Sequence, residues 1–175
     1  RFSSTTGDVK WVRTGGRAFM EKGAVVRVAG YLQDITKEKK AEETARYRDA
    51  LLREMGRIAL VGGWEFDPET GRGTWTDEVA RIHGLSPDEE TSLKKGLGFY
   101  NGESRRRILR AVRDAVKEGR PYDLDLELVT PSGEKKWVRT IGRPVMENGR
   151  VVKVQGSFQD ITSLKNYENR IEHLN

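Results

Sequence analysis

The sequence of 175 residues contains no cysteine and only two histidines, His83 and His173. The absence of cysteine excludes disulfides, thiolate metal sites and cysteine nucleophiles, and it fits a reducing compartment. Two histidines that lie far apart in the sequence do not make a zinc site without cysteine ligands. We therefore predict no metal site.

Long apolar runs are also absent, since no segment approaches the roughly 20 residues that span a membrane. The first residues, RFSSTTGDVKWVRT, are polar and unlike a secretory leader, and the chain does not begin with Met. We expect a cytoplasmic piece of a longer protein that makes no membrane contact. The net charge is +5, but 32 Lys and Arg are scattered among 27 Asp and Glu, so we expect no nucleic-acid binding.

A repeated segment organises the chain. Residues 7–36 read GDVKWVRTGGRAFMEKGAVVRVAGYLQDIT, and residues 133–162 read GEKKWVRTIGRPVMENGRVVKVQGSFQDIT. The two copies align without a gap at an offset of 126, and about two thirds of their positions are identical. Each copy has the pattern of a β-hairpin, because two β-rich runs flank a turn that contains glycine.

The segment between the copies, residues 37–60, predicts a helix because it lacks proline and is rich in helix formers. Its small and apolar residues follow a 4-3-4-3-4 spacing, with Arg48 at the remaining position, and this spacing is typical of a coiled-coil seam. The seam residues are Ala41, Ala45, Leu52, Met55 and Ala59. The same spacing suits an amphipathic helix that lies on its own domain, but we favour a helix that forms a homodimer.

Residues 61–163 have the pattern of one complete α+β domain. Alternating apolar and polar residues predict an antiparallel sheet. Its five strands are expected at 64–67, 73–76, 122–130, 135–146 and 150–160. Gly62 and Gly63 are expected to end the preceding helix. Thr76 is expected to cap a short helix at 77–83, and Asn101 a longer one at 102–118. The expected core is Trp64, Phe66, Ile108, Val112, Leu124, Leu126, Val152, Val154 and Phe158.

This order of elements resembles the Per-Arnt-Sim (PAS) family. Three segments look like the C-terminal PAC motif of this family: the GEKKWVRT strand, the ENGRVV turn and the GSFQDIT ending. The segment WTDEVARIHGLSPDE looks like the start of the family's helical half. The resemblance covers 60–163 completely and 1–36 in part. It implies a PAS fold, a five-stranded antiparallel sheet with helices on one face. Residues 1–36 would be the closing hairpin of a preceding copy, and 164–175 would begin an outgoing signalling helix.

The resemblance also implies a sensory role. PAS domains sense small molecules, light, redox state or oxygen, or hold dimers together, and they pass a signal to an output domain in the same polypeptide. We expect a signal-relay and dimerisation module of a sensor histidine kinase in a two-component system. The alternative is a receptor domain that binds a small ligand or a non-covalent cofactor. The Asp-Ile-Thr segments would be signal junctions, with Asp34, Thr36, Asp160 and Thr162 as their polar residues.

Aromatic side chains are candidates for a ligand pocket, although they also suit a plain core. The candidates are Trp64, Phe66, Trp75, Phe99, Tyr100, Tyr122, Trp137 and Phe158, together with His83. No cofactor is favoured. The haem-binding members carry their histidine ligand on the long helix, and 102–118 has none; the cysteinyl-flavin members need the cysteine that this chain lacks. The sequence contains no Gly-rich phosphate loop, HExxH or kinase signature, so we expect no enzyme activity in this segment.

Overall fold

The computed structural model describes residues 2–3 and 7–172. The chain divides into two compact units, residues 1–52 and 53–175. Parts of the expected N-terminal hairpin (1 and 4–6) and of the expected outgoing helix (173–175) lie outside the described residues.

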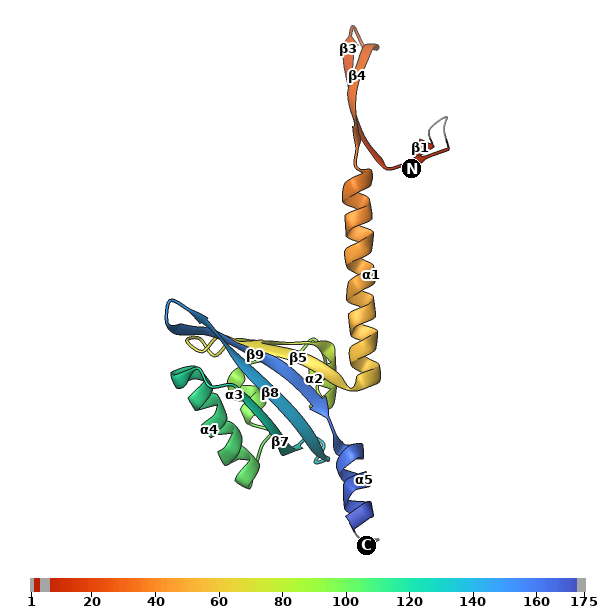
Figure 1. Cartoon of the computed structure of the whole chain (residues 1–175). Helices are drawn as coiled ribbons and strands as arrows, with labels where there is room; N and C mark the ends of the chain where they lie inside the picture. The colour runs from red at the N-terminus through yellow and green to blue at the C-terminus, as the bar shows by residue number, and fades with distance from the viewer. Residues whose placement is uncertain (1, 4–6, 173–175) are drawn as a thin grey trace. The chain divides into compact units, whose positions relative to one another are not determined.

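The first unit contains two antiparallel strand pairs. The short strands β1 (Phe2–Ser3) and β2 (Val9–Lys10) pair with each other, and β3 (Val12–Glu21) pairs with β4 (Ala24–Asp34). Helix α1 (Thr36–Ala59) follows β4 (Figure 1). The helix and the hairpin predicted between residues 7 and 60 are therefore both present.

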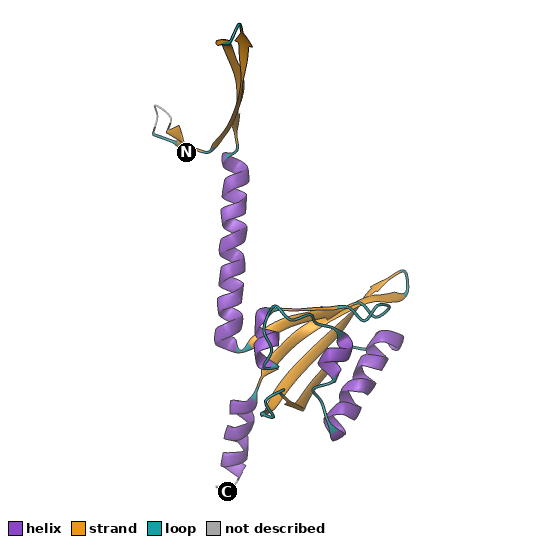
Figure 2. Ribbon diagram, turned by 180° about the vertical axis from the view of Figure 1, so that it is seen from behind, coloured by secondary structure: helices purple, strands orange, loops and turns teal. Residues whose placement is uncertain are grey.

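The second unit is built on a five-stranded sheet in the order β6-β5-β9-β8-β7, and every neighbouring pair in it is antiparallel. Its strands are β5 (Val61–Phe66), β6 (Gly73–Trp75), β7 (Tyr122–Val129), β8 (Lys135–Glu147) and β9 (Arg150–Asp160). Three helices, α2 (Asp77–Ile82), α3 (Leu93–Leu97) and α4 (Gly102–Glu118), cover one face of the sheet (Figure 2). The predicted α+β fold is confirmed. Helix α5 (Thr162–Glu172) follows β9.

The core lies between the sheet and these helices. Helix α4 buries Ile108, Val112 and Ala115, because these residues recur on one side of the helix. Leu126, Val138 and Val154 from three neighbouring strands are fully buried below it. The core prediction holds for Phe66, Ile108, Val112, Leu126, Val154 and Phe158, whereas Trp64 and Leu124 are partly buried against this cluster.

Val152 contradicts the core prediction, because 39% of its surface is exposed. The register shift between Val145 and Met146 explains the difference. Val145 pairs with Lys153 and Met146 pairs with Val151, so Val152 is the extra residue of a β-bulge. The bulge places Val151, in place of Val152, against the core.

The predicted end of the helix between the repeats is wrong in detail. Leu60, with a φ of 53°, follows the end of α1, while Gly62 and Gly63 belong to β5. A Cβ atom on Gly62 would lie 2.5 Å from Cγ2 of Val79, so glycine permits the close packing of α2 on β5. Thr76 and Asn101 occupy the N-cap positions of α2 and α4, as predicted, but neither side chain makes a capping hydrogen bond. The Thr76 hydroxyl instead accepts a hydrogen bond from the Gly63 N–H at 3.1 Å.

The two repeated hairpins share one register. Val12 pairs with Asp34 as Val138 pairs with Asp160, and each later pair keeps the offset of 126 residues. The bulge recurs as well, at Val26 in the first hairpin. The repeat in the sequence is therefore a repeat in structure down to the strand pairing.

Candidate functional site

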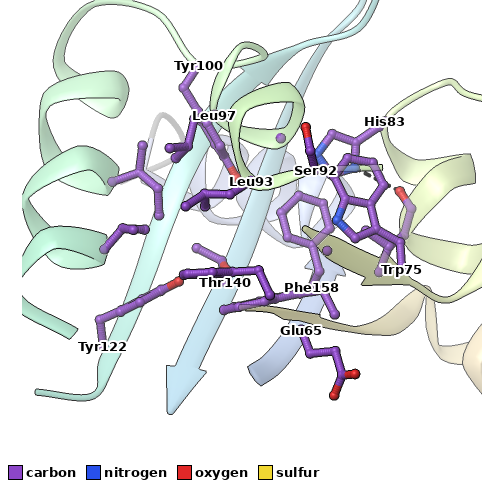
Figure 3. A pocket seen from close by; sticks show the side chains of 17 residues that line it. Glu65, Trp75, His83, Ser92, Leu93, Leu97, Tyr100, Tyr122, Thr140 and Phe158 are labelled. Carbon is purple, nitrogen blue, oxygen red and sulfur yellow. Dashed lines mark hydrogen bonds between the residues drawn. The ribbon is translucent and has the colours of Figure 1, made fainter. Parts of the chain in front are cut away.

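A cavity of about 60 Å³ lies in the core of the second unit, between the sheet and helices α2, α3 and α4 (Figure 3). Seven of the nine side chains that the sequence analysis gives as pocket candidates line it. These are Trp64, Phe66, Trp75, His83, Tyr100, Tyr122 and Phe158. Phe99 is not in the lining, but it makes an edge contact with the His83 ring, with 4.9 Å between the ring centroids.

One predicted residue lies apart from this cluster, and the lining includes residues that were not predicted. Trp137 does not line the cavity; it lies against the start of α5, where Nζ of Lys165 is 5.7 Å from its ring centroid. Thr140 of β8 does line the cavity, and the sequence analysis missed it. Its place in the alternation of β8, two residues after the buried Val138, is the signal that would have found it.

His83 is the central polar residue of this cluster. Its ring is stacked between Trp75 and Phe158, with centroid distances of 4.4 and 4.6 Å. Nδ1 lies 2.8 Å from the carbonyl oxygen of Val79. A carbonyl only accepts, so Nδ1 carries the proton and Nε2 is an acceptor. Burial lowers the pKa of His83 to about 4, so the ring is neutral near pH 7.

The second candidate site is the junction between β9 and α5. The Asp160 carboxylate accepts a hydrogen bond from the Thr162 N–H at 3.0 Å and another from the Thr162 hydroxyl at 2.6 Å. The Trp137 N–H donates to the same hydroxyl oxygen at 3.1 Å. Nζ of Lys165, in the first turn of α5, lies 3.1 Å from the Asp125 carboxylate on β7. The first turn of α5 is thus tied to three strands of the sheet.

The junction between β4 and α1 repeats this arrangement. The Thr36 N–H donates to Asp34 at 3.0 Å, and the Trp11 N–H donates to the Thr36 hydroxyl at 2.9 Å. Hydrogen bonds from Thr36 lower the pKa of Asp34 to about 2. Nζ of Lys39 lies 5.9 Å from the Trp11 ring centroid, and the equivalent Nζ of Lys165 lies 5.7 Å from that of Trp137. All four predicted junction residues occupy equivalent positions.

The third candidate, the seam on α1, is exposed. No side chain of this helix is buried. Leu52 and Met55 are 68% and 57% exposed, and Tyr47, Leu51 and Ile58 are exposed as well. An apolar helix face of this kind is suited to contact with another helix.

Within the residues that the structure describes, no cluster of three or more His, Asp or Glu side chains could hold a metal ion. In the same part of the chain, no helix combines the length and the apolar character needed to cross a membrane.

Comparison with known proteins identifies a family model, curated relatives and solved structures that are similar to this chain. Residues 73–158 match the family model described as the PAS fold. A blue-light-activated histidine kinase of Brucella ovis is 32% identical over 139 residues, which are 78% of this chain and 28% of that protein. The corresponding kinase of Brucella anthropi is 25% identical over 140 residues, again 28% of its length. The chain thus spans little more than a quarter of these curated relatives.

Solved structures share the fold. A sensory box histidine kinase/response regulator from Burkholderia thailandensis has a TM-score of 0.58 and 21% identity, over 69% of this chain and 92% of that one. A domain of a putative light and redox sensing histidine kinase from Haloarcula marismortui has a TM-score of 0.53 and 21% identity, over 65% and 99%. The sheet order, the helices on one face and the matched residues 73–158 lead to one conclusion: the second unit of this chain is a PAS domain.

Proposed function

We propose that this chain is a signal-relay and dimerisation module of a larger signalling protein, a sensor histidine kinase, and that it is not itself an enzyme. The repeated junction carries this proposal. Two hairpins of the same register each end in Asp-Ile-Thr, and each leads directly into a helix through the same hydrogen bonds. A joint that fixes a helix to a sheet in this way transmits a change in the sheet to the helix.

The relatives support the proposal. The Brucella proteins are named as histidine kinases, and this chain matches 28% of their length. That share leaves room for an output domain in the same polypeptide. A cytoplasmic location is part of the proposal, in keeping with the lack of cysteine.

The size of the core cavity favours relay over the binding of a large cofactor. Typical small-molecule sites measure about 300–1,000 Å³, whereas this cavity measures about 60 Å³. The aromatic side chains of Trp64, Trp75 and Phe158 occupy much of the space between the sheet and the helices. A light response through a cysteinyl-flavin is not part of this proposal, because the chain has no cysteine.

The first unit fits the same scheme as the closing hairpin of a preceding PAS domain. Val28 and Leu32 are 70% and 66% exposed. Their counterparts Val154 and Phe158, at an offset of 126, are 0% and 3% exposed. The hairpin thus exposes the face that its copy buries beneath the helical half of the domain. We propose that residues upstream in the longer protein supply that half.

Negatively charged substitutions at the seam positions of α1 test whether the chain dimerises through this helix. Leu52→Glu together with Met55→Glu is expected to convert a dimer to a monomer in sedimentation equilibrium, because two carboxylates on each helix would have to be buried at the interface. The matched control is Arg46→Ala with Ala50→Glu, which makes the same change in net charge on the other side of the helix. A dimer that survives the first pair, or a monomer before any substitution, would contradict the proposed seam.

A further inference from the structure

The positive charge of this chain is concentrated on helix α4. Residues 102–120 contain seven Arg and Lys and three Asp and Glu, so this segment has a net charge of +4, against +5 for the whole chain. In the rest of the chain the two signs therefore nearly balance. A segment in which one sign of charge gathers in this way attracts a partner of the opposite sign.

Four of these cations form a stripe along the exposed side of α4. Arg106, Arg110, Arg113 and Lys117 follow a 4-3-4 spacing, which places them on one side of a helix. All four residues are exposed, and the buried residues of α4 lie on the opposite side of the helix. At 1.5 Å per residue, the four positions extend over about 16 Å. We call these four residues the basic stripe.

The basic stripe has few counter-charges. Within the described part of the chain, the side chains of Arg106, Arg110 and Lys117 make no ion pair or hydrogen bond, whereas Arg113 pairs with Asp114 at 2.8 Å. Like charges three or four residues apart destabilise a helix. An anionic partner would relieve this repulsion along the whole stripe.

A groove of about 310 Å³ lies beside the stripe, between α4 and the start of β7. Arg110 belongs to both the stripe and the groove. Asp114 also borders the groove, but its carboxylate accepts two hydrogen bonds from Arg113, at 3.0 and 2.8 Å. The rest of the lining combines cations with apolar side chains, among them Arg107, Arg120, Ala111, Pro121 and Leu124. The groove can therefore hold an apolar side chain close to the cations.

The chemistry of this surface favours an acidic protein segment over a membrane or a nucleic acid. A helix that binds membranes presents several apolar side chains beside its cations, but Leu109, at 41%, is the one large apolar side chain that α4 exposes. Proteins that bind single strands stack the bases on aromatic side chains, and α4 contains no aromatic residue. Guanidinium groups, in contrast, match carboxylates in bidentate geometry.

We propose that the basic stripe and the adjacent groove dock an acidic helical segment of another protein. The carboxylates of that segment would follow the 4-3-4 spacing of the stripe, and one of its apolar side chains would enter the groove. This docking surface is additional to the proposed relay and does not depend on it.

A synthetic helical peptide tests this proposal on the whole chain. The probe carries four glutamates at the 4-3-4 spacing and one leucine beside them, and its control carries glutamine in place of each glutamate. Fluorescence anisotropy of the labelled peptide measures binding at about 50 and about 150 mM salt. We expect saturable binding of the acidic peptide alone, weaker at the higher salt. Amide chemical shifts of the ¹⁵N-labelled chain should change on α4 and at the start of β7.

Two double variants separate a specific surface from a general effect of charge. Arg106→Gln with Arg110→Gln is expected to weaken binding of the acidic peptide about tenfold, because two carboxylates lose their guanidinium partners. The matched control is Arg53→Gln with Lys135→Gln, which makes the same change in net charge at two exposed residues outside this surface. The control should change the affinity by less than about twofold.

No saturable binding, equal affinity for the glutamine peptide, or an equal loss in both double variants would overturn the proposal. Shifts confined to α1 or to the outer face of the sheet would overturn it as well. A single-stranded oligonucleotide or phosphatidylserine vesicles that bind more tightly than the peptide at the higher salt would overturn it in favour of another class of partner. The wild-type titrations decide the question even if a variant fails to fold. The proposed relay and dimer are measured separately, by the hydrogen exchange of α5 and by sedimentation.

Discussion

The internal repeat supplies a matched pair of substitutions at equivalent positions. Val154 of β9 is fully buried opposite Phe66 and Pro144, whereas Val28 of β4 is 70% exposed. Val154→Ala removes two buried methyl groups, at about 0.8 kcal/mol each for transfer, and leaves a cavity that adds to the cost. We expect the free energy of unfolding to fall by about 2–3 kcal/mol. Val28→Ala should change it by less than about 0.5 kcal/mol.

Urea unfolding followed by tryptophan fluorescence measures both values, because Trp64 and Trp75 belong to the core of the second unit and Trp11 lies in the first unit with Val28. Each variant is compared with the wild-type chain at one protein concentration, so that any dimer contributes equally. Equal losses for the two variants would refute the account, since Val28 would then be covered in this chain. A loss below about half a kcal/mol for Val154→Ala would show that β9 does not face a packed core.

Two further predictions concern the same core. Leu126→Ala, at a fully buried position in β7, should cost about 2–5 kcal/mol in urea unfolding; a loss under about half a kcal/mol would place Leu126 in solvent. His83 makes stability depend on pH. Its pKa is about 6.5 in the unfolded chain and about 4 in the fold, so the unfolded chain binds more protons between these values. Stability should be complete above pH 6.5 and fall by about 3 kcal/mol towards pH 4, and His83→Gln should lack this component. The same pH slope in His83→Gln would refute the assignment.

The sequence predicts most of the fold because its signals are local or repeated. The alternation of Tyr122, Leu124, Leu126 and Leu128 identified β7, and Asn148-Gly149 identified the turn between β8 and β9, where both residues have positive φ. The repeat also predicts which residues of the two hairpins are equivalent, because the two copies align residue by residue. The equal register in the structure is the physical counterpart of that alignment.

The errors arise where packing at a distance decides the outcome. Strict alternation cannot reveal a bulge, so Val152 was assigned to the wrong face. Gly62 looked like a helix terminator, but its role is to let Val79 approach β5, and that contact spans 17 residues. Thr140 was overlooked because a single threonine in a strand gives no signal of its own. Its importance comes from Tyr100, Tyr122 and His83, which the fold brings to the same cavity.

The relay is tested most directly by hydrogen exchange of α5 after a change in the core. Thr140→Val alters the cavity in β8 without touching the Asp160–Thr162 joint. The reference is the hydrogen-exchange rate of the buried middle of α4 in the same sample, because exchange there reports global unfolding. The account predicts that the exchange rate of the first turn of α5, Thr162 to Lys165, changes by more than this reference. Unchanged exchange in α5, or a change equal to that in α4, would show that the junction does not carry a signal from the core.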